Sequence, residues 1–284
     1  MKKRITNVSF EFFPPKNDEA INSLWLNIRR LEPLKPRFIS VTYGAGGSTR
    51  ENTHDLVKQI KKDTNLEPAA HLTCIGSTRG EIEKIANDYW DAGVRHIVAL
   101  RGDRPKINDK TINNGDFKFA TDLIKFLKER FDFDITVSAY PEIHPDSNSI
   151  EQEYDILKKK VDLGASKAIT QFFFDVEYYF KFIDGAVKRG ITIPIIPGIL
   201  PVTNCKRTIE FANKMNCKVP DELIEMFKGL DSDQETRKLV AASVVHDQCR
   251  RLIEGGINDF HFYTLNRADL SFAICHIIGV RAIG

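Results

Sequence analysis

Short apolar runs alternate with amphipathic stretches along the whole chain, and this alternation constrains the fold more than any other feature. No run exceeds nine residues, and each is rich in β-branched or aromatic residues. Runs of this kind are typical of buried parallel strands. The eight runs are Ile5–Phe13, Phe38–Tyr43, Ala69–Cys74, His96–Leu100, Ile135–Tyr140, Ala168–Phe173, Ile191–Ile196 and Asp259–Tyr263.

The intervening stretches carry apolar residues at helical spacing, so each predicted strand is followed by a predicted helix. Gly93, Gly164 and Gly190 follow such stretches, where a left-handed helix cap is favoured. The clearest helical patterns span Asn17–Leu31, Arg79–Ala92, Phe117–Phe131, Ile150–Leu163 and Val176–Lys188.

Eight strand–helix units predict an α/β fold, a single (β/α)8 TIM barrel, with an open doubly wound sheet as the alternative. A length of 284 residues suits one such barrel, so we expect one domain over residues 1–284. The stretch Pro201–Gly256 is too long for one helix. We therefore expect two or three helices between strands seven and eight.

The composition excludes several classes of function. A net charge of +2 without a basic stripe disfavours nucleic-acid binding, and no apolar run is long enough to span a membrane. The five cysteines form no C-x-x-C pair, and the histidines show no metal-ligand spacing, so we expect no metal site. Without an apolar signal segment at the N-terminus, a cytoplasmic location is the expectation.

Polar residues follow the predicted strands at their carboxyl ends, which is where TIM barrels build their ligand sites. Glu11 is the most informative, because it lies among Phe10, Phe12 and Phe13. Poor solvation there predicts a raised pKa, as a general acid at neutral pH requires. A structural ion pair with an arginine or lysine is the alternative for this residue.

Other strand ends offer further candidates. Asp103 follows Arg101 and Gly102, where the glycine would let the backbone approach a ligand; a charged surface pair is the alternative. The loop Gly44–Thr49 lacks the spacing of a dinucleotide-binding turn. Lys167 begins a strand instead of ending it, which argues against a Schiff-base aldolase.

Seven segments at these strand ends together resemble methylenetetrahydrofolate reductase, with the spacing of the bacterial enzymes. The match runs in order through nearly the whole chain. The segments are SFEFFPP (Ser9–Pro15), VTYG (Val41–Gly44), HLTC (His71–Cys74), HIVALRGD (His96–Asp103), TQFFFD (Thr170–Asp175), IPGILPV (Ile196–Val202) and FHFYTLNR (Phe260–Arg267).

The resemblance implies an FAD-dependent enzyme that reduces 5,10-methylenetetrahydrofolate to 5-methyltetrahydrofolate for methionine synthesis. Its reductant would be NADH or NADPH, with NADH favoured, in a ping-pong mechanism. Glu11 would assist opening of the folate ring, and Asp103 would tune the flavin and help to bind folate. The implied substrate-binding residues are Gln171, Arg207, Phe211 and Arg267. The implied cofactor-binding residues are Thr42, Tyr43, His71, Arg101, Gly102, Asp103, Ala120, Tyr140, His144, Glu153, Lys159 and Lys160.

Four positions depart from the family pattern. Arg207 replaces a glutamine, Glu153 replaces an aspartate, and Ser147 and Ile156 also differ. These departures concern binding of the glutamate tail and of adenosine. The resemblance also implies a homo-oligomer, such as a tetramer, without the adenosylmethionine-sensing domain of the eukaryotic type. The alternatives are another flavin barrel, such as a proline dehydrogenase, and a non-catalytic module that binds folate or flavin.

Overall fold

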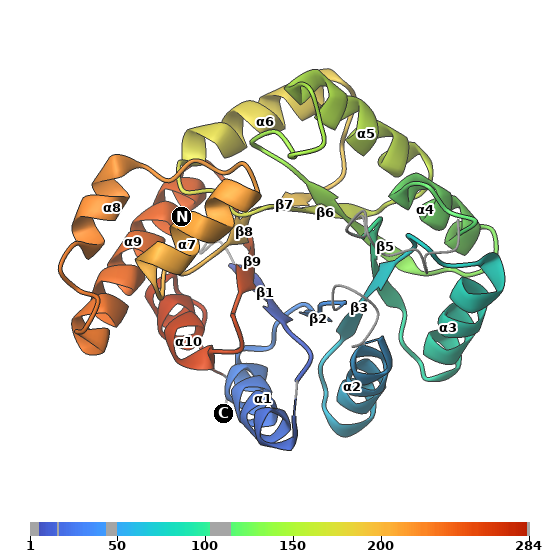
Figure 1. Ribbon diagram of the computed structural model, residues 1–284, viewed down its shortest axis with the longest axis horizontal. Coiled ribbons are helices and arrows are strands. Elements are labelled where there is room, and N and C mark those ends of the chain that lie inside the picture. Colours follow the sequence, from blue (N-terminus) through green and yellow to red (C-terminus); the bar gives the residue numbers. More distant parts are fainter. Residues whose placement is uncertain (1–5, 16, 44–49, 103–114, 283–284) are drawn as a thin grey trace, which may run out of the picture.

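Parallel strands form one continuous sheet in the computed structural model, which describes residues 6–15, 17–43, 50–102 and 115–282. The order of the strands is β7-β6-β5-β4-β3-β2-β1-β9-β8, and every recorded pairing is parallel. Figure 1 shows the strands as an inner ring and the helices as an outer ring. The strands are β1 (Asn7–Phe12), β2 (Ile39–Val41), β3 (Pro68–Thr73), β4 (His96–Leu100), β5 (Asp134–Ala139), β6 (Lys167–Thr170), β7 (Ile195–Ile196), β8 (Gly198–Ile199) and β9 (Asp259–Tyr263).

The ring closes through β7 and β8, which are two pieces of the seventh barrel strand. β7 pairs with β6, β8 pairs with β9, and Pro197 lies between them. The backbone oxygen of Pro197 accepts a hydrogen bond from the backbone N–H of His261 at 3.0 Å, which joins the two halves. The predicted TIM barrel is therefore confirmed.

The predicted bounds of the seventh strand, Ile191–Ile196, were wrong. Ile191 instead lies in the turn that caps the preceding helix, where its backbone N–H donates to the oxygen of Ala186 at 3.0 Å. Pro194 has no N–H to give to a sheet, so the ladder begins after it. Ile191 is buried all the same, which explains why the apolar pattern suggested a strand.

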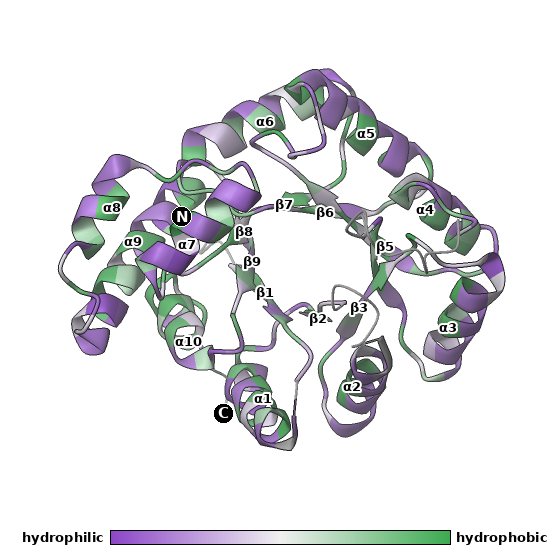
Figure 2. Ribbon diagram, in the orientation of Figure 1, coloured by the Kyte–Doolittle hydropathy of each residue, from purple (hydrophilic) through white to green (hydrophobic). Residues whose placement is uncertain are grey.

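Alternation along each strand separates two kinds of core. On β1, Phe10 and Phe12 join the main apolar core with Leu24 and Ile28 of the first helix. Phe38, just before β2, belongs to a smaller apolar cluster with residues of β3, β4, β6 and β7. Figure 2 shows the apolar faces of the helices turned toward the ring and their polar faces turned outward. The main core is thus the layer between sheet and helices.

The helices begin and end where local chemistry favours it. Asn17 caps the first helix, and Thr78 and Glu81 form a capping box at the third. Gly93, Gly164 and Gly190 have positive φ after their helices, as predicted. The helices are α1 (Asp18–Leu31), the 3-10 turn η1 (Glu32–Leu34), α2 (Arg50–Asp63), α3 (Arg79–Asp91), α4 (Ala120–Lys128), α5 (Ile150–Asp162), α6 (Val176–Lys188), α7 (Cys205–Lys214), α8 (Asp221–Phe227), α9 (Gln234–Glu254) and α10 (Ala268–Ile277).

Three helices, α7, α8 and α9, lie between the seventh strand and β9, which confirms the extra helices predicted for this stretch. In Figure 1 all three are drawn on the left, on the outer side of β8 and β9, and α8 packs against α9. Within the described ranges, no helix combines the length and the apolar character that crossing a membrane requires.

Candidate active site

Glu11 lies near the carboxyl end of β1, where two histidines face its side chain. Nε2 of His71, on β3, is 3.3 Å from Oε2 of Glu11, and Nε2 of His261, on β9, is 3.7 Å from the same oxygen. Both are ion-pair distances, longer than a short hydrogen bond. The predicted ion-pair alternative named an arginine or lysine, whereas the ion-pair partners of Glu11 among the described residues are histidines.

The pKa of Glu11 lies below the usual range of a carboxyl group. Burial alone would raise it, but the charge of His71 and the contacts of both imidazoles outweigh burial and lower the pKa from 4.5 to about 2. The predicted rise in pKa was therefore wrong. Phe10 and Phe12 lie on the opposite face of the strand, and Phe13 is exposed, so these aromatic rings do not surround the carboxylate.

The backbone of Glu11 is fixed by the loop that follows β9. Its carbonyl oxygen accepts hydrogen bonds from the Thr264 hydroxyl at 2.6 Å and from the Thr264 N–H at 3.2 Å. The side-chain amide of Asn266 bonds to both backbone groups of Phe13. Its Oδ1 accepts from the N–H of Phe13 at 2.8 Å, and its Nδ2 donates to the oxygen of Phe13 at 3.0 Å. The acid is thus held at both its backbone and its side chain.

Arg101, Tyr140 and His144, all predicted to bind the cofactor, are brought together beyond β4 and β5. Arg101 Nη2 donates to Asp146 at 2.7 Å, and the N–H of Asp146 donates to Nδ1 of His144 at 3.0 Å. The Tyr140 and His144 rings pack edge to face at 4.6 Å. Burial lowers the pKa of His144, so its neutral form is favoured.

Gly102 has a φ of +88°, which L side chains rarely adopt. A Cβ at this position would lie 3.0 Å from Ile75 Cγ2 and 3.1 Å from Thr73 Cβ. Both the conformation and the space therefore require glycine here. Asp103, the next residue, lies outside the described residues, as does the loop Gly44–Thr49.

Helix α5 carries two predicted cofactor residues that are buried. Nζ of Lys160 donates to the backbone oxygen of Ser138 at 3.0 Å, and burial lowers its pKa from 10.5 to about 8. Glu153 is also buried, and among the described residues its Oε1 has no hydrogen-bond partner. Lys159 is exposed, and Ala120 is the buried first residue of α4.

Thr42 and Tyr43 follow β2 and are half-buried. The backbone N–H of Thr42 donates to the oxygen of Phe12 at 2.9 Å, and its own oxygen accepts from Thr53. The ring of Tyr43 packs edge to face on His54 at 5.6 Å.

The predicted substrate residues come from three segments. Gln171 follows β6, and its N–H donates to the oxygen of Ala139 at 2.8 Å. Phe211, on α7, is 38% exposed, and its ring centre lies 5.1 Å from that of Phe172. Arg207, one turn earlier on α7, and Arg267, at the start of α10, are exposed.

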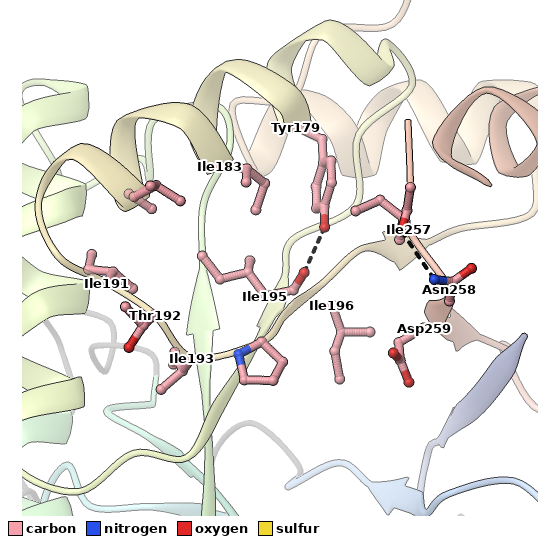
Figure 3. Close-up of a pocket in the computed structure, with 14 residues that line it drawn as sticks. Tyr179, Ile183, Ile191, Thr192, Ile193, Ile195, Ile196, Ile257, Asn258 and Asp259 are labelled. Carbon is pink, nitrogen blue, oxygen red and sulfur yellow. Dashed lines mark hydrogen bonds between the residues drawn. The ribbon is translucent and has the colours of Figure 1, made fainter. Parts of the chain in front are cut away.

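Two cavities occur at the opposite end of the barrel. One, of about 470 Å³, lies between α6 and the segments entering β7 and β9 (Figure 3), and the other, of about 640 Å³, includes Phe38 and His96. Tyr179 closes part of the first by donating to the oxygen of Ile195 at 2.7 Å. Lys167 begins β6 there and pairs with Asp134. Because ligand sites of TIM barrels form at the carboxyl ends of the strands, we place the active site around Glu11.

Sequence reasoning placed Ser9, His261, Thr264 and Asn266 in strand-end segments but predicted no role for them. The alternation within Asp259–Tyr263 could have located His261, because a period of two places it on the same face as Tyr263. The contacts of Thr264 and Asn266 join residues about 250 positions apart. No local pattern signals them.

Comparison with known proteins identifies the family. The family model of methylenetetrahydrofolate reductase matches residues 1–279. The 5,10-methylenetetrahydrofolate reductases of Salmonella typhimurium and Escherichia coli are each 54% identical over 275 residues, which is 97% of this chain and 91% of the relative. The Arabidopsis thaliana protein named methylenetetrahydrofolate reductase (NADH) 1 is 34% identical over 273 residues, covering 92% of this chain and 46% of that protein.

Solved structures of low identity share the fold. An uncharacterized protein from Clostridium thermocellum, described as binding two copies of 5-methyl-5,6,7,8-tetrahydrofolic acid, has a TM-score of 0.64 at 16% identity, covering 96% of this chain and 94% of that chain. Dihydropteroate synthase from Xanthomonas albilineans has a TM-score of 0.52 at 10% identity, covering 99% and 94%. By sequence over its whole length, the chain is an oxidoreductase and belongs to the methylenetetrahydrofolate reductase family.

Proposed function

We propose that the chain reduces 5,10-methylenetetrahydrofolate to 5-methyltetrahydrofolate, with FAD as its cofactor and NADH as its reductant. The observation that carries the proposal is the position of Glu11, an acid held beside two histidines at the carboxyl end of β1. The two substrates would use the flavin in turn, which gives ping-pong kinetics. The product would feed methionine synthesis.

The residues beyond β4 and β5 fit a flavin. Gly102 turns the chain after β4 with a positive φ and packs directly against Thr73 and Ile75. Lys160 and Glu153, whose Oε1 has no hydrogen-bond partner in the part of the chain that the structure describes, offer buried polar groups on α5. Arg101, Tyr140 and His144 would complete this side of the site, with Thr42, Tyr43, Ala120 and Lys159. When bound, the flavin would supply the hydride chemistry, and the protein would supply orientation and electrostatics.

Glu11 would donate a proton to the nitrogen that leaves carbon when the imidazolidine ring of folate opens. A carboxyl group with a pKa of about 2 holds few protons at neutral pH, so the proton would be shared within the group formed by Glu11, His71 and His261. Gln171 and Phe211 would position the folate, with Arg207 and Arg267 at the end that carries the glutamate tail. Asp103 would assist folate binding and tune the flavin.

The choice of NADH is supported by the Arabidopsis relative, which is named for NADH, and by the bacterial character of the closely similar relatives. We also propose a cytoplasmic enzyme with one catalytic domain over residues 1–284 that assembles into a homo-oligomer, such as a tetramer. Light scattering of the purified protein tests the assembly, and release of FAD on denaturation tests the cofactor.

The role of Glu11 is tested by Glu11→Gln, with the two half-reactions measured separately by stopped-flow absorbance. We expect reduction of the flavin by NADH to keep its rate, because that step needs no proton from Glu11. Reoxidation by methylenetetrahydrofolate should slow by at least about 100-fold, the range that general acid catalysis supplies. Equal losses in both half-reactions would contradict the assigned role.

A further inference from the structure

His261 is a fully buried histidine on β9 whose two ring nitrogens face different polar side chains. Nδ1 lies 2.8 Å from the hydroxyl oxygen of Ser9, and Nε2 faces Oε2 of Glu11 at 3.7 Å. The ring also stacks on Phe38, with centres 5.6 Å apart. Among the described residues, Nε2 makes no hydrogen bond, and the Glu11 carboxylate is its ion-pair partner. The ring is therefore held at one nitrogen and aimed at the acid with the other.

The contacts of Ser9 and Glu11 together bear on the ring proton of His261. The hydroxyl oxygen of Ser9 lies 2.8 Å from Nδ1 and 3.3 Å from the backbone oxygen of Phe260, so the hydroxyl can donate to Nδ1, or it can accept from Nδ1 and donate to Phe260. The Glu11 carboxylate favours the first arrangement, in which the neutral ring carries its proton on Nε2, toward Glu11. The opposite tautomer would turn a lone pair toward the carboxylate, which is unfavourable.

We propose that His261, held at Nδ1 by Ser9, is a positioning residue that holds the Glu11 carboxylate in place and controls when it takes up the proton it donates. This inference rests on the proposed role of Glu11 as the acid. It deepens that role, because it names the residues through which the barrel prepares the acid. Ser9 and His261 act through Glu11 and need not touch the substrate.

The charges around this group give the expected direction of the pH effect. His71 faces Glu11 from β3, Tyr263 follows on β9, and His96 lies beyond Phe38. Burial lowers the pKa of His261, which favours the neutral donor at neutral pH. A donor at Nε2 stabilises the Glu11 carboxylate and contributes to lowering its pKa. Loss of this donor should therefore raise the pKa of Glu11.

The test compares His261→Asn, which is too short to place a donor at the carboxylate, with His261→Gln, which keeps an N–H near the position of Nε2. Both holoenzymes are assayed in the two half-reactions across pH. In His261→Asn, flavin reduction by NADH should be unchanged, while the maximal rate of reoxidation by methylenetetrahydrofolate falls by roughly tenfold or more. Its decline with rising pH should begin about one pH unit higher than in the wild type. His261→Gln should recover most of the rate, and Ser9→Ala should shift the profile in the same direction as His261→Asn.

A matched control is His96→Asn. His96 is also a buried histidine bonded to a hydroxyl, with Nε2 2.7 Å from Oγ1 of Thr136, but it is not an ion-pair partner of Glu11. It should lower thermal stability without moving the pH profile. The inference is overturned if His261→Asn leaves the profile unmoved, slows both half-reactions equally, or is matched by His96→Asn. Failure of the wild type to pass electrons from NADH to folate would instead overturn the proposed function.

Discussion

At the scale of single residues, Lys160 places an ammonium group where water cannot reach it. Its nitrogen bonds to the oxygen of Ser138, and its pKa falls to about 8 because burial penalises the charged form. The unfolded chain, with a lysine pKa of 10.5, binds this proton more tightly than the folded chain does. The unfavourable contribution is therefore fully present below pH 8 and is relieved as the pH rises from 8 to 10.5. Its size is roughly 3 kcal/mol.

Lys160→Met is predicted to stabilise the apoprotein at pH 7 by about 1–3 kcal/mol, because a thioether chain fills the space without a charge. The rise in stability between pH 8 and 10.5 should disappear. Urea unfolding of the apoprotein at pH 7 and pH 10 measures both effects, and the exposed neighbour Lys159→Met serves as the control. If Lys160 helps to hold the flavin, the variant should also retain less FAD. A stability unchanged at both pH values would contradict this account.

Glu11 shows what a linear sequence can and cannot reveal about a residue. Its location at a strand end, and hence in the site, followed from the alternation of elements alone. Its electrostatic surroundings did not, because Phe10 and Phe12 are adjacent in sequence but face the other side of the strand. The histidines that determine its charge state come from β3 and β9, and only the register of the sheet brings them together.

At the scale of elements, the loop from β9 to α10 combines backbone strain with a precise anchor. Leu265 and Asn266 both adopt positive φ, at 51° and 56°, which is costly for residues other than glycine. Asparagine tolerates this region, and its amide gains two hydrogen bonds to Phe13 in return. Asn266 therefore tolerates the positive φ and also places its side chain against Phe13, the residue that follows β1.

Two substitutions separate these contributions. Asn266→Gly removes the amide but suits the positive φ, so we expect a loss of about 1–2 kcal/mol from the two hydrogen bonds. Asn266→Ala removes the amide and adds strain, so it should be less stable than Asn266→Gly by about 1 kcal/mol. Urea unfolding gives the order asparagine, glycine, alanine; an alanine variant as stable as the glycine variant would show that the backbone is not strained.

Most elements were predictable because their patterns are local. Strand alternation, helical spacing and glycine caps each act over a few residues, so the barrel and the three helices before β9 followed from the sequence. The seventh strand did not, because Ile191 is buried against the helix end instead of joining the ladder. Burial by a helix and burial by a strand give the same short apolar run.

At the scale of the whole molecule, closure of the barrel depends on β8, two residues that follow Pro197. Gly198 donates its N–H to the Thr170 hydroxyl at 2.9 Å and pairs with His261. A Cβ here would overlap the backbone oxygen of Thr170 and lie 2.7 Å from Cε2 of Tyr263. The space at position 198, between Thr170 and Tyr263, therefore admits only glycine.

Gly198→Ala is predicted to destabilise the protein by more than about 3 kcal/mol, since backbone atoms must move to admit the methyl group. Hydrogen exchange should increase first in β8 and β9. Gly80→Ala is the control: nothing lies within 4 Å of the added carbon, and alanine favours helix, so its stability should be equal or slightly higher. If Gly198→Ala were about as stable as Gly80→Ala, the proposed role of Gly198 in closing the barrel would be contradicted.

The anchoring of Glu11 by Thr264 and Asn266 also bears on when the enzyme becomes active. The backbone oxygen of Glu11 accepts a hydrogen bond from the hydroxyl of Thr264, which lies 253 positions later in the chain. During translation, β1 is among the first strands to leave the ribosome, yet its partner β9 is among the last. The acid therefore acquires its final position only after β9 and Thr264 have been synthesised and have packed against β1. A chain interrupted before β9 would carry every residue proposed to bind the flavin but would lack the contacts of Thr264, Asn266 and His261 that hold Glu11 in place.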